Sequence, residues 1–261
     1  MSEFSLPSRK EHSVRKPETF ILDGTTGLSQ IICGDALKEL AKFKDHSIDA
    51  IITDPPFALS GGSCYGRSSE VSNQFWFYWW KDICKELNRV MDPHGEGFVW
   101  CDWETASLMA QGFCYKQQYG LRASQVIYHY REMPGQGNPF RNSVDMILYI
   151  RGSKSKAHRI PNTTQNWISK YWYYGKHEYH PSEKSVDITR QLIRWCSDEG
   201  MLILDPFCGS GTTLIACELE HRRSIGIDIE IEYVDIAKSR LLALRKQTSL
   251  MKLPKVEEVS G

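Results

Sequence analysis

A carboxylate and two prolines directly follow an apolar, β-branched segment near the start of the chain. In Asp54-Pro55-Pro56-Phe57, the two prolines restrict the backbone after the segment at residues 48–53. If that segment is a buried strand, the turn would aim the Asp54 carboxylate and the Pro55 carbonyl into the cleft where α/β sheets bind ligands. Two neighbouring acceptors suit an exocyclic amino group with its two N–H donors, and Phe57 could stack on a planar base. Taken alone, the motif fits an ordinary Pro-Pro turn equally well.

A glycine-rich segment about 150 residues further along the chain is the second candidate. The apolar segment that ends at Asp205 is followed by a tight turn, whose other candidate residues are Phe207, Gly209, Ser210, Gly211 and Thr212. Glycines let a ligand approach the backbone closely, and amides at a helix N-terminus can meet a carboxylate or phosphate. The segment is neither a dinucleotide-binding G-x-G-x-x-G nor a P-loop. An ordinary strand-to-helix turn is the alternative, but Asp228 ends the next apolar segment, where α/β nucleotide sites hold ribose hydroxyls.

Alternating apolar segments predict the elements that must position these residues. We expect strands at residues 31–32, 48–53, 97–100, 123–130, 144–150, 201–205 and 224–229. We expect helices at residues 36–43, 81–91, 182–196, 212–220 and 231–246. Strands that alternate with helices predict an α/β fold with a doubly wound, mostly parallel sheet that is covered on both faces.

The aromatic block at residues 75–80 has two interpretations. Trp76 and Trp80 continue one helical face together with Ile83 and Leu87, at spacings of 4, 3 and 4. This periodicity favours core packing over a platform on which bases stack.

The motifs, taken together and in this order, resemble those of the β-class amino-group DNA methyltransferases, which use S-adenosylmethionine. Two further segments fit the class, ICGD at 32–35 and HPSEK at 180–184. The resemblance spans roughly residues 29–245 and is weakest between 105 and 180. It implies a Rossmann-like methyltransferase fold with a permuted motif order and a small target-recognition insert.

The same resemblance implies a role for each matching residue. The catalytic residues that hold the target base would be Asp54, Pro55, Pro56 and Phe57. The cofactor would be bound by Asp35 at its adenine amino group, Asp228 at its ribose hydroxyls, Lys184 and His180 at its methionine carboxylate, and Phe207, Gly209, Ser210, Gly211 and Thr212 along its methionine side. Asp205 would anchor this loop. The family usually has tyrosine where Phe57 stands and commonly has proline where Ser185 stands, and neither change puts activity in doubt.

The resemblance divides the chain into five parts. We expect a partly disordered lead-in at 1–28, a catalytic half at 29–121, a target-recognition region at about 122–180, a cofactor half at 181–245 and a tail at 246–261. The Gly- and Ser-rich stretch at 58–74 is either a loop that closes over a flipped-out nucleotide or a plain surface loop.

The charge distribution points to nucleic acid in one region only. The chain has 32 basic and 32 acidic residues, which excludes a uniformly basic binder. Residues 122–184 hold ten Lys and Arg against four Asp and Glu, a local charge of +6. The DNA-contacting candidates there are Arg131, Arg141, Lys154, Lys156, Arg159, Lys170 and Lys176. Tyr128 or His129 could form the second wall of a base pocket, and a solvated basic face is the alternative.

These observations predict a site-specific enzyme that methylates the N6 amino group of a flipped-out adenine in double-stranded DNA. The alternatives are an N4-cytosine DNA methyltransferase and a non-catalytic nucleic-acid-binding subunit. An RNA or protein-glutamine methyltransferase is disfavoured by the motif order. The eight cysteines form no C-x-x-C pair, so we expect no metal site. Without a signal sequence or a membrane span, we expect a cytoplasmic protein, bacterial or phage-encoded, that acts on the nucleoid; a homodimer and a cognate restriction enzyme remain open as partners.

Overall fold

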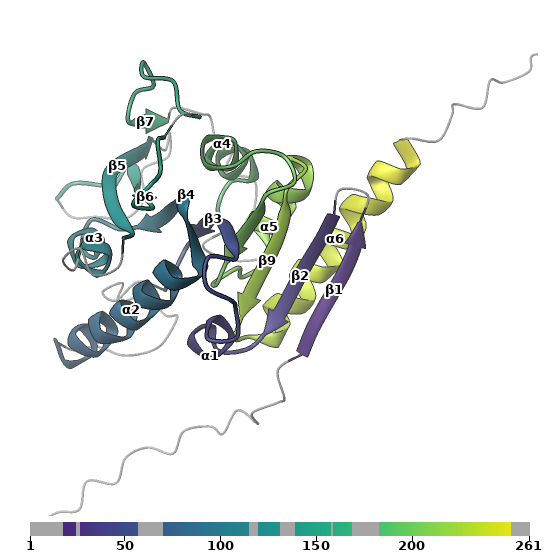
Figure 1. Cartoon of the computed structure of the whole chain (residues 1–261), viewed down its shortest axis with the longest axis horizontal. Coiled ribbons are helices and arrows are strands. Elements are labelled where there is room, and N and C mark those ends of the chain that lie inside the picture. Colours follow the sequence, from purple (N-terminus) through teal and green to yellow (C-terminus); the bar gives the residue numbers. More distant parts are fainter. Residues whose placement is uncertain are drawn as a thin grey trace, which may run out of the picture.

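A nine-stranded sheet organises the part of the chain that the computed structural model describes, which comprises residues 18–24, 27–56, 70–114, 120–130, 139–157, 159–168 and 183–251. The strands are β1 (Glu18–Gly24), β2 (Gly27–Cys33), β3 (Ile48–Thr53), β4 (Met91–Cys101), β5 (Arg122–Tyr130), β6 (Val144–Arg151), β7 (Trp167–Ile168), β8 (Leu202–Asp205) and β9 (Arg223–Asp228). Their order across the sheet is β1-β2-β9-β8-β3-β4-β6-β5-β7 (Figure 1).

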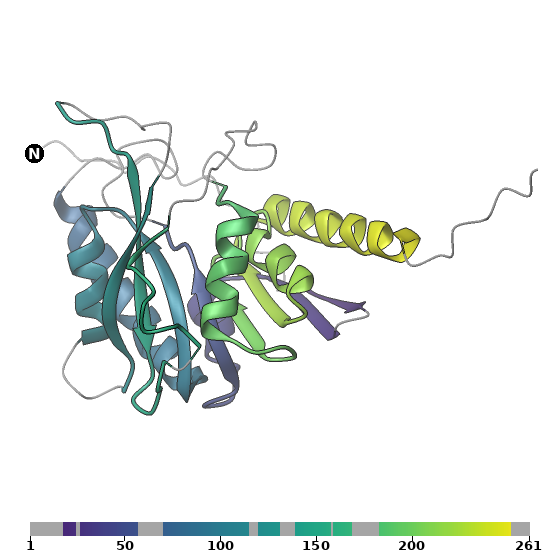
Figure 2. The same cartoon turned by 90° about the horizontal axis from the view of Figure 1, so that it is seen from above.

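Six helices cover the two faces of this sheet. They are α1 (Ala36–Leu40), α2 (Glu70–Val90), α3 (Ala106–Cys114), α4 (Val186–Cys196), α5 (Thr212–Leu219) and α6 (Ile231–Met251). Helices α1 to α3 pack on one face, and α4 to α6 pack on the other (Figure 2). The predicted doubly wound α/β architecture is confirmed. None of the helices in the described ranges is long and apolar enough to span a membrane.

The central strands β2, β9, β8, β3 and β4 run parallel, so their carboxyl ends meet at one edge. Ile51 and Ile52 of β3 point to opposite faces, and both are fully buried. Burial of each such side chain contributes roughly 1.5–3 kcal/mol. Strands β3 and β8 pair directly through Ala50 with Ile203 and Ile51 with Leu204. The two motifs, distant in the sequence, therefore leave the sheet side by side.

The chain leaves these two strands in opposite directions, which opens a crevice between them. After β3 it passes through α2 on one face to β4, and after β8 it passes through α5 on the other face to β9. Such a reversal of strand order is where open α/β sheets bind ligands.

Several elements differ from the sequence-based expectation. The region through residue 28 contains β1, a paired strand that forms a hairpin with β2. Strand β4 begins at Met91, and its register against β3 shifts between Ile48 and Ala50 to accommodate the Pro93–Gly95 stretch. Helix α3 and the two-residue strand β7 carry patterns too short or too weak for prediction. Of the Gly- and Ser-rich stretch, residues 70–74 belong to α2, and residues 58–69 lie outside the described residues.

Candidate active site at the carboxyl edge of the sheet

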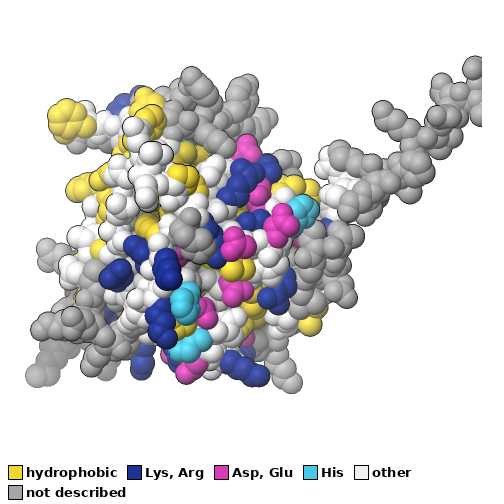
Figure 3. Space-filling view, turned by 45° about the horizontal axis from the view of Figure 1, so that its top comes forward, with side chains coloured by type: hydrophobic (Ala, Val, Ile, Leu, Met, Phe, Trp, Pro, Cys, Tyr) yellow, Lys and Arg dark blue, Asp and Glu magenta, His cyan; other side chains and the backbone are white. Residues whose placement is uncertain are grey.

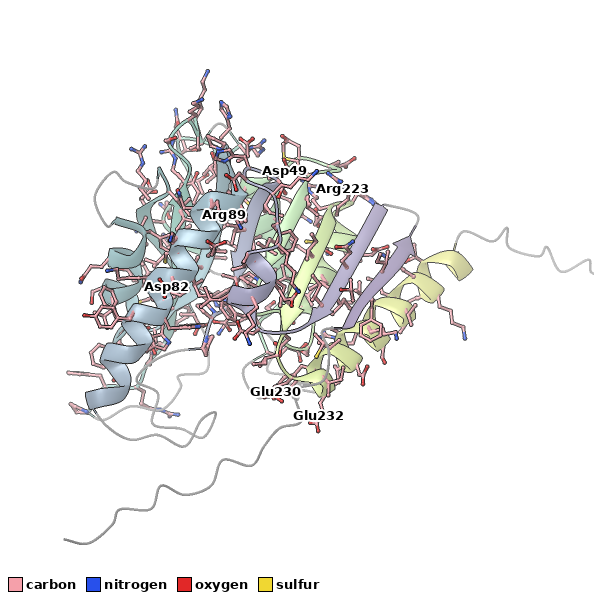
Figure 4. The ribbon with its side chains drawn as sticks, turned by 60° about the horizontal axis from the view of Figure 1, so that its bottom comes forward. Asp49, Asp82, Arg89, Arg223, Glu230 and Glu232 are labelled. Atoms are coloured by element: carbon pink, nitrogen blue, oxygen red, sulfur yellow. The ribbon has the colours of Figure 1, made fainter. Side chains whose placement is uncertain are left out.

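Each of the five central parallel strands ends at an aspartate or within two residues of one. The aspartates that follow or end β2, β9, β8, β3 and β4 are Asp35, Asp228, Asp205, Asp54 and Asp102. Figure 4 shows Asp49 and Arg223, at strand starts, on one end of the sheet and Glu230 and Glu232, just beyond β9, on the other. The carboxylates therefore gather along one edge. Four of them are the aspartates predicted from the sequence; Asp102 was not predicted, and its side chain caps α3 by accepting from the Thr105 amide at 2.7 Å.

Asp205 joins the two motifs. Its buried Oδ1 accepts hydrogen bonds from Thr53 Oγ1 at 2.7 Å and from the Phe207 amide at 3.1 Å. Burial raises the pKa of Asp205 to about 7, against the hydrogen bonds from Thr213, Thr53 and Phe207, which lower it; the nearby Asp54 charge raises it further. Since Thr53 directly precedes Asp54, one buried carboxyl ties the end of β3 to the glycine-rich loop.

The Asp54 carboxylate pairs with Lys184. Asp54 Oδ2 lies 3.0 Å from Lys184 Nζ, and both side chains are largely buried. The same ammonium lies 5.2 Å from the centre of the Trp100 ring. Lys184 is placed here by α4, because it directly precedes the N-cap residue Ser185, whose hydroxyl accepts from the Ile188 amide. The resemblance implied that Lys184 would lie at the methionine carboxylate of the cofactor; the structure shows its ammonium against the carboxylate of the catalytic candidate Asp54.

The prolines of the first motif differ in their surroundings. Pro55 is buried and Pro56 is exposed, and the Pro56 carbonyl accepts a hydrogen bond from Trp76 Nε1 at 2.8 Å. Phe57 lies outside the described residues, as does His180. The sequence periodicity assigned Trp76 to the core and gave no signal for this contact.

The glycine-rich loop has the backbone that only glycine adopts readily. Gly209 and Gly211 have φ angles of +48° and +86°. A Cβ on Gly211 would lie 2.7 Å from Ala237, whereas a Cβ on Gly209 would meet nothing within 4 Å. The Gly209 amide donates to Asp228 Oδ2 at 2.9 Å. An open stretch of backbone thus lies beside carboxylates at strand ends, a donor and acceptor set that fits a ligand with hydroxyl and amino groups.

Two residues outside the predicted set hold this loop against the segment that carries Lys184. Arg240 of α6 donates to the Ser210 carbonyl at 2.8 Å and pairs with Glu183 at 2.7 Å. Glu183 also lies 3.5 Å from the Thr212 hydroxyl. No sequence pattern distinguishes Arg240 from the other basic residues of its helix.

Comparison with known proteins identifies the family to which the chain belongs. The profile of the N6/N4 family described as DNA methylase matches residues 48–239, about three quarters of the chain. The chain belongs to this DNA methyltransferase family. Its cofactor is therefore S-adenosylmethionine, as the resemblance implied.

Relatives and solved structures agree with this assignment. The methyltransferase is 29% identical over 239 residues to the type II methyltransferase M.HpaI of Haemophilus parainfluenzae, covering 81% of this chain and 74% of that protein. It is 23% identical over 243 residues to the DNA adenine methyltransferase YhdJ of Escherichia coli K12, covering 81% and 82%. The M1.HpyAVI–SAM complex superposes with a TM-score of 0.63 at 25% identity, covering 81% and 98%. The cytosine-N4-specific PvuII DNA methyltransferase shares the fold, with a TM-score of 0.66 at 17% identity and coverage of 84% and 92%.

The predicted DNA-contacting residues of the methyltransferase fall into three groups. Arg131, Lys170 and Lys176 lie outside the described residues. Arg141 is exposed just before β6, whose start pairs with the carboxyl end of β4, so it lies at the active-site edge.

The third group, Lys154, Lys156 and Arg159, follows the other end of β6. The Lys154 backbone amide donates to the Pro93 carbonyl there, and the Arg159 side chain is paired with Asp198 at 2.6 Å. The two ends of this ladder, at Glu96 and Cys101 of β4, are five residue steps apart, which is about 17 Å. On the face in Figure 3, which brings this opposite edge forward, basic side chains are interspersed with acidic ones and histidines.

Exposed aromatic side chains gather on the strands beside the active site. Tyr130 and Trp103, at the carboxyl ends of β5 and β4, are 50% and 69% exposed, and Phe140 before β6 is 88% exposed. Tyr128 is exposed and pairs in register with Trp167, also exposed, on β7. His129 is buried against Trp100 and contacts Asp145 at 3.2 Å. Of the two candidates for a base-pocket wall, Tyr128 therefore reaches the surface.

Proposed function

We propose that this DNA methyltransferase transfers a methyl group from S-adenosylmethionine to the N6 amino group of adenine at a specific sequence in double-stranded DNA. One observation carries the proposal. The Asp54-Pro55 acceptors lie at the end of β3, next to β8 and its open glycine loop, and the Thr53–Asp205 bond joins the two. Acceptors for an amine are thus fixed beside a loop suited to the methyl donor.

The cofactor supplies a methyl group on a positively charged sulfur, which is already electrophilic. The chain has to align the amine and make its lone pair available. Hydrogen bonds from the amine to the Asp54 carboxylate and the Pro55 carbonyl would favour a pyramidal nitrogen, because they oppose delocalisation of the lone pair into the ring. The Asp54 carboxylate would also stabilise the positive charge that develops on that nitrogen.

The residues proposed to hold the cofactor surround the same edge. Asp35 and Asp228 would accept from its adenine amino group and ribose hydroxyls, and the open backbone at Gly209 would lie along its methionine part. Lys184 would serve the cofactor carboxylate from a position in which it also pairs with Asp54 at 3.0 Å.

Adenine is proposed because of the residue type at position 54. Cytosine-N4 enzymes of the family more often carry serine there, and the relative YhdJ is described as a DNA adenine methyltransferase. A base inside a duplex cannot reach such a crevice, so the adenine would have to be flipped out. Arg141 and the exposed aromatics beside the site would contact the DNA around it.

In this proposal residues 29–121 form the catalytic half, 122–180 the target-recognition region and 181–245 the cofactor half. A homodimer and a cognate restriction enzyme stay predictions of the sequence.

The proposal is tested by incubating the purified protein with DNA and S-adenosylmethionine tritiated on the methyl group, followed by nucleoside analysis and mapping of the modified positions. We expect label in N6-methyladenine at a short recurring sequence. Label in N4-methylcytosine would contradict the choice of base, and a wild-type protein that binds the cofactor but labels no DNA would favour a non-catalytic subunit.

A further inference from the structure

Two tryptophans one turn apart on α2 reach the two loops of the active site. Trp76 Nε1 donates to the Pro56 carbonyl at 2.8 Å. The Trp79 ring lies 5.5 Å from the ring of Phe207 in the glycine-rich loop. Helix α2 runs antiparallel to β3, and Figure 4 shows Asp82 nearer than Arg89 to the active-site end of the sheet. The start of this helix is thus in position to act on both loops.

The loop after β3 needs such a contact because of its sequence. Pro55 and Pro56 have no N–H, so this stretch of backbone can be held only through its carbonyl oxygens. The Pro55 carbonyl is the proposed acceptor for the target amine. Its direction is fixed when the residues on both sides are fixed, and Asp54 on one side is held by Lys184. On the other side, the Pro56 carbonyl is held by Trp76.

Trp76 is itself held by the core. Its ring stacks on Trp80, with centroids 5.9 Å apart and an interplanar angle of 12°. Trp80 is fully buried, donates to the Met109 carbonyl at 3.1 Å and meets Phe113 edge-on at 5.5 Å. A continuous stack therefore runs from the core to the Pro56 carbonyl.

We propose that Trp76 is a positioning residue of the methyl-transfer reaction. By holding the Pro56 carbonyl, it keeps the Pro55 carbonyl and the Asp54 carboxylate aimed at the target amine, and the neighbouring Trp79 keeps the cofactor loop at a fixed distance from them. This inference rests on the proposed methyl transfer. It departs from the interpretation of residues 75–80 as core alone, since among Trp76 to Trp80, the part of this block whose burial is described, only Trp80 is fully buried.

The chain offers a matched pair of variants as a test. Trp76→Phe and Trp80→Phe each remove one indole hydrogen bond to a backbone carbonyl and keep an aromatic ring in the same stack. The single-turnover rate of methyl transfer, the dissociation constant for S-adenosylmethionine and the unfolding temperature would be measured for both. We expect Trp76→Phe to lower the rate about 10- to 100-fold, with cofactor affinity changed by less than about threefold, because a small misplacement of the acceptors is costly. Trp80→Phe should lower the unfolding temperature and leave the rate within about threefold of wild type.

Each result bears on the inference. A Trp76→Phe variant that transfers methyl groups as fast as Trp80→Phe, or that does not fold, would assign the indole to stability and overturn the proposal. Trp79→Leu provides a second arm: we expect it to weaken cofactor binding more than Trp76→Phe does, because it contacts Phe207. An unchanged cofactor affinity would remove Trp79 from the proposal. If wild type itself transfers no methyl group, the proposed function fails, and that outcome is distinct from equal rates in the two phenylalanine variants.

Discussion

The parallel half of the sheet and its antiparallel end differ in the burial of their side chains. In β2, β9, β8, β3 and β4 the side chains are buried on both faces, and polar groups appear where the strands end. Strands β5 and β7, at the outer end of the sheet, have one solvent-facing side, on which Tyr128, Tyr130 and Trp167 are exposed. The parallel half holds its acceptors by hydrogen bonds inside a buried scaffold, and the outer end presents exposed aromatic side chains. Under the proposed function, methyl transfer takes place in the parallel half, and the exposed end contacts the DNA.

The largest effect is expected at Asp205, the buried carboxyl that joins β3 and the glycine-rich loop in the parallel half. Below about pH 4 the Asp205 carboxyl is protonated in both the folded and the unfolded chain. Between about pH 4 and pH 7 it ionises in the unfolded chain but stays protonated in the folded one, because burial raises its folded pKa to about 7. This difference favours the unfolded state, so folding stability falls as the pH rises. Relative to Asp205→Asn, the wild-type free energy of unfolding should fall by a few kcal/mol between about pH 4 and pH 7. Denaturant unfolding at several pH values measures this, and parallel pH profiles for the two proteins would contradict it.

Arg240 tests whether cofactor binding at the glycine-rich loop depends on a residue that was not among the predicted cofactor-binding residues. Arg240→Met should weaken S-adenosylmethionine binding about tenfold, because it releases both Ser210 and Glu183. Arg245, on the same helix, forms an equally buried ion pair with Glu218 and is the control. Isothermal titration should show weakened cofactor binding for Arg240→Met but not for Arg245→Met, while both variants lose a similar amount of stability. Equal affinities would restrict Arg240 to a structural role.

Arg141 and Lys154 compare the two ends of the antiparallel ladder, and here the expected effect is smallest. Both side chains are exposed, but Arg141 lies at the active-site edge and Lys154 beside Pro93. Arg141→Ala should weaken DNA binding a few-fold and reduce the salt dependence by about one phosphate contact. Fluorescence anisotropy at several salt concentrations would show this, with Lys154→Ala near wild type. A larger loss for Lys154→Ala would place the DNA along the opposite edge.

Sequence predicted the framework of the fold and the positions of the two motifs at strand ends, because both rest on local patterns. Apolar segments that lead into Asp54 and Asp205 are visible without any structure. Their pairing follows only from the strand order, in which β8 inserts beside β3. Periodicity placed Trp76 on the face that includes Trp80, yet it carries no information about the carbonyl that the indole nitrogen reaches.

Other features were out of reach for similar physical reasons. The Lys184–Asp54 pair joins residues far apart in the chain, and nothing in the HPSEK segment indicates which carboxylate its lysine meets. The basic surplus of residues 122–184 predicted one interaction surface. The strand directions instead divide the described members of that set between two ends of β6.

The central claim is that the Asp54 carboxylate promotes methyl transfer from a cofactor site that does not depend on it. The most direct test measures single-turnover methyl transfer and S-adenosylmethionine affinity on the same preparations of wild type, Asp54→Asn and Asp49→Asn. Asp49 lies at the other end of β3, where it accepts from the Leu202 amide at 2.7 Å. We predict that Asp54→Asn loses at least about 100-fold in rate while its cofactor affinity stays within about threefold, and that Asp49→Asn keeps a rate near wild type. An Asp54→Asn enzyme that retains more than about a tenth of the wild-type rate would contradict the account.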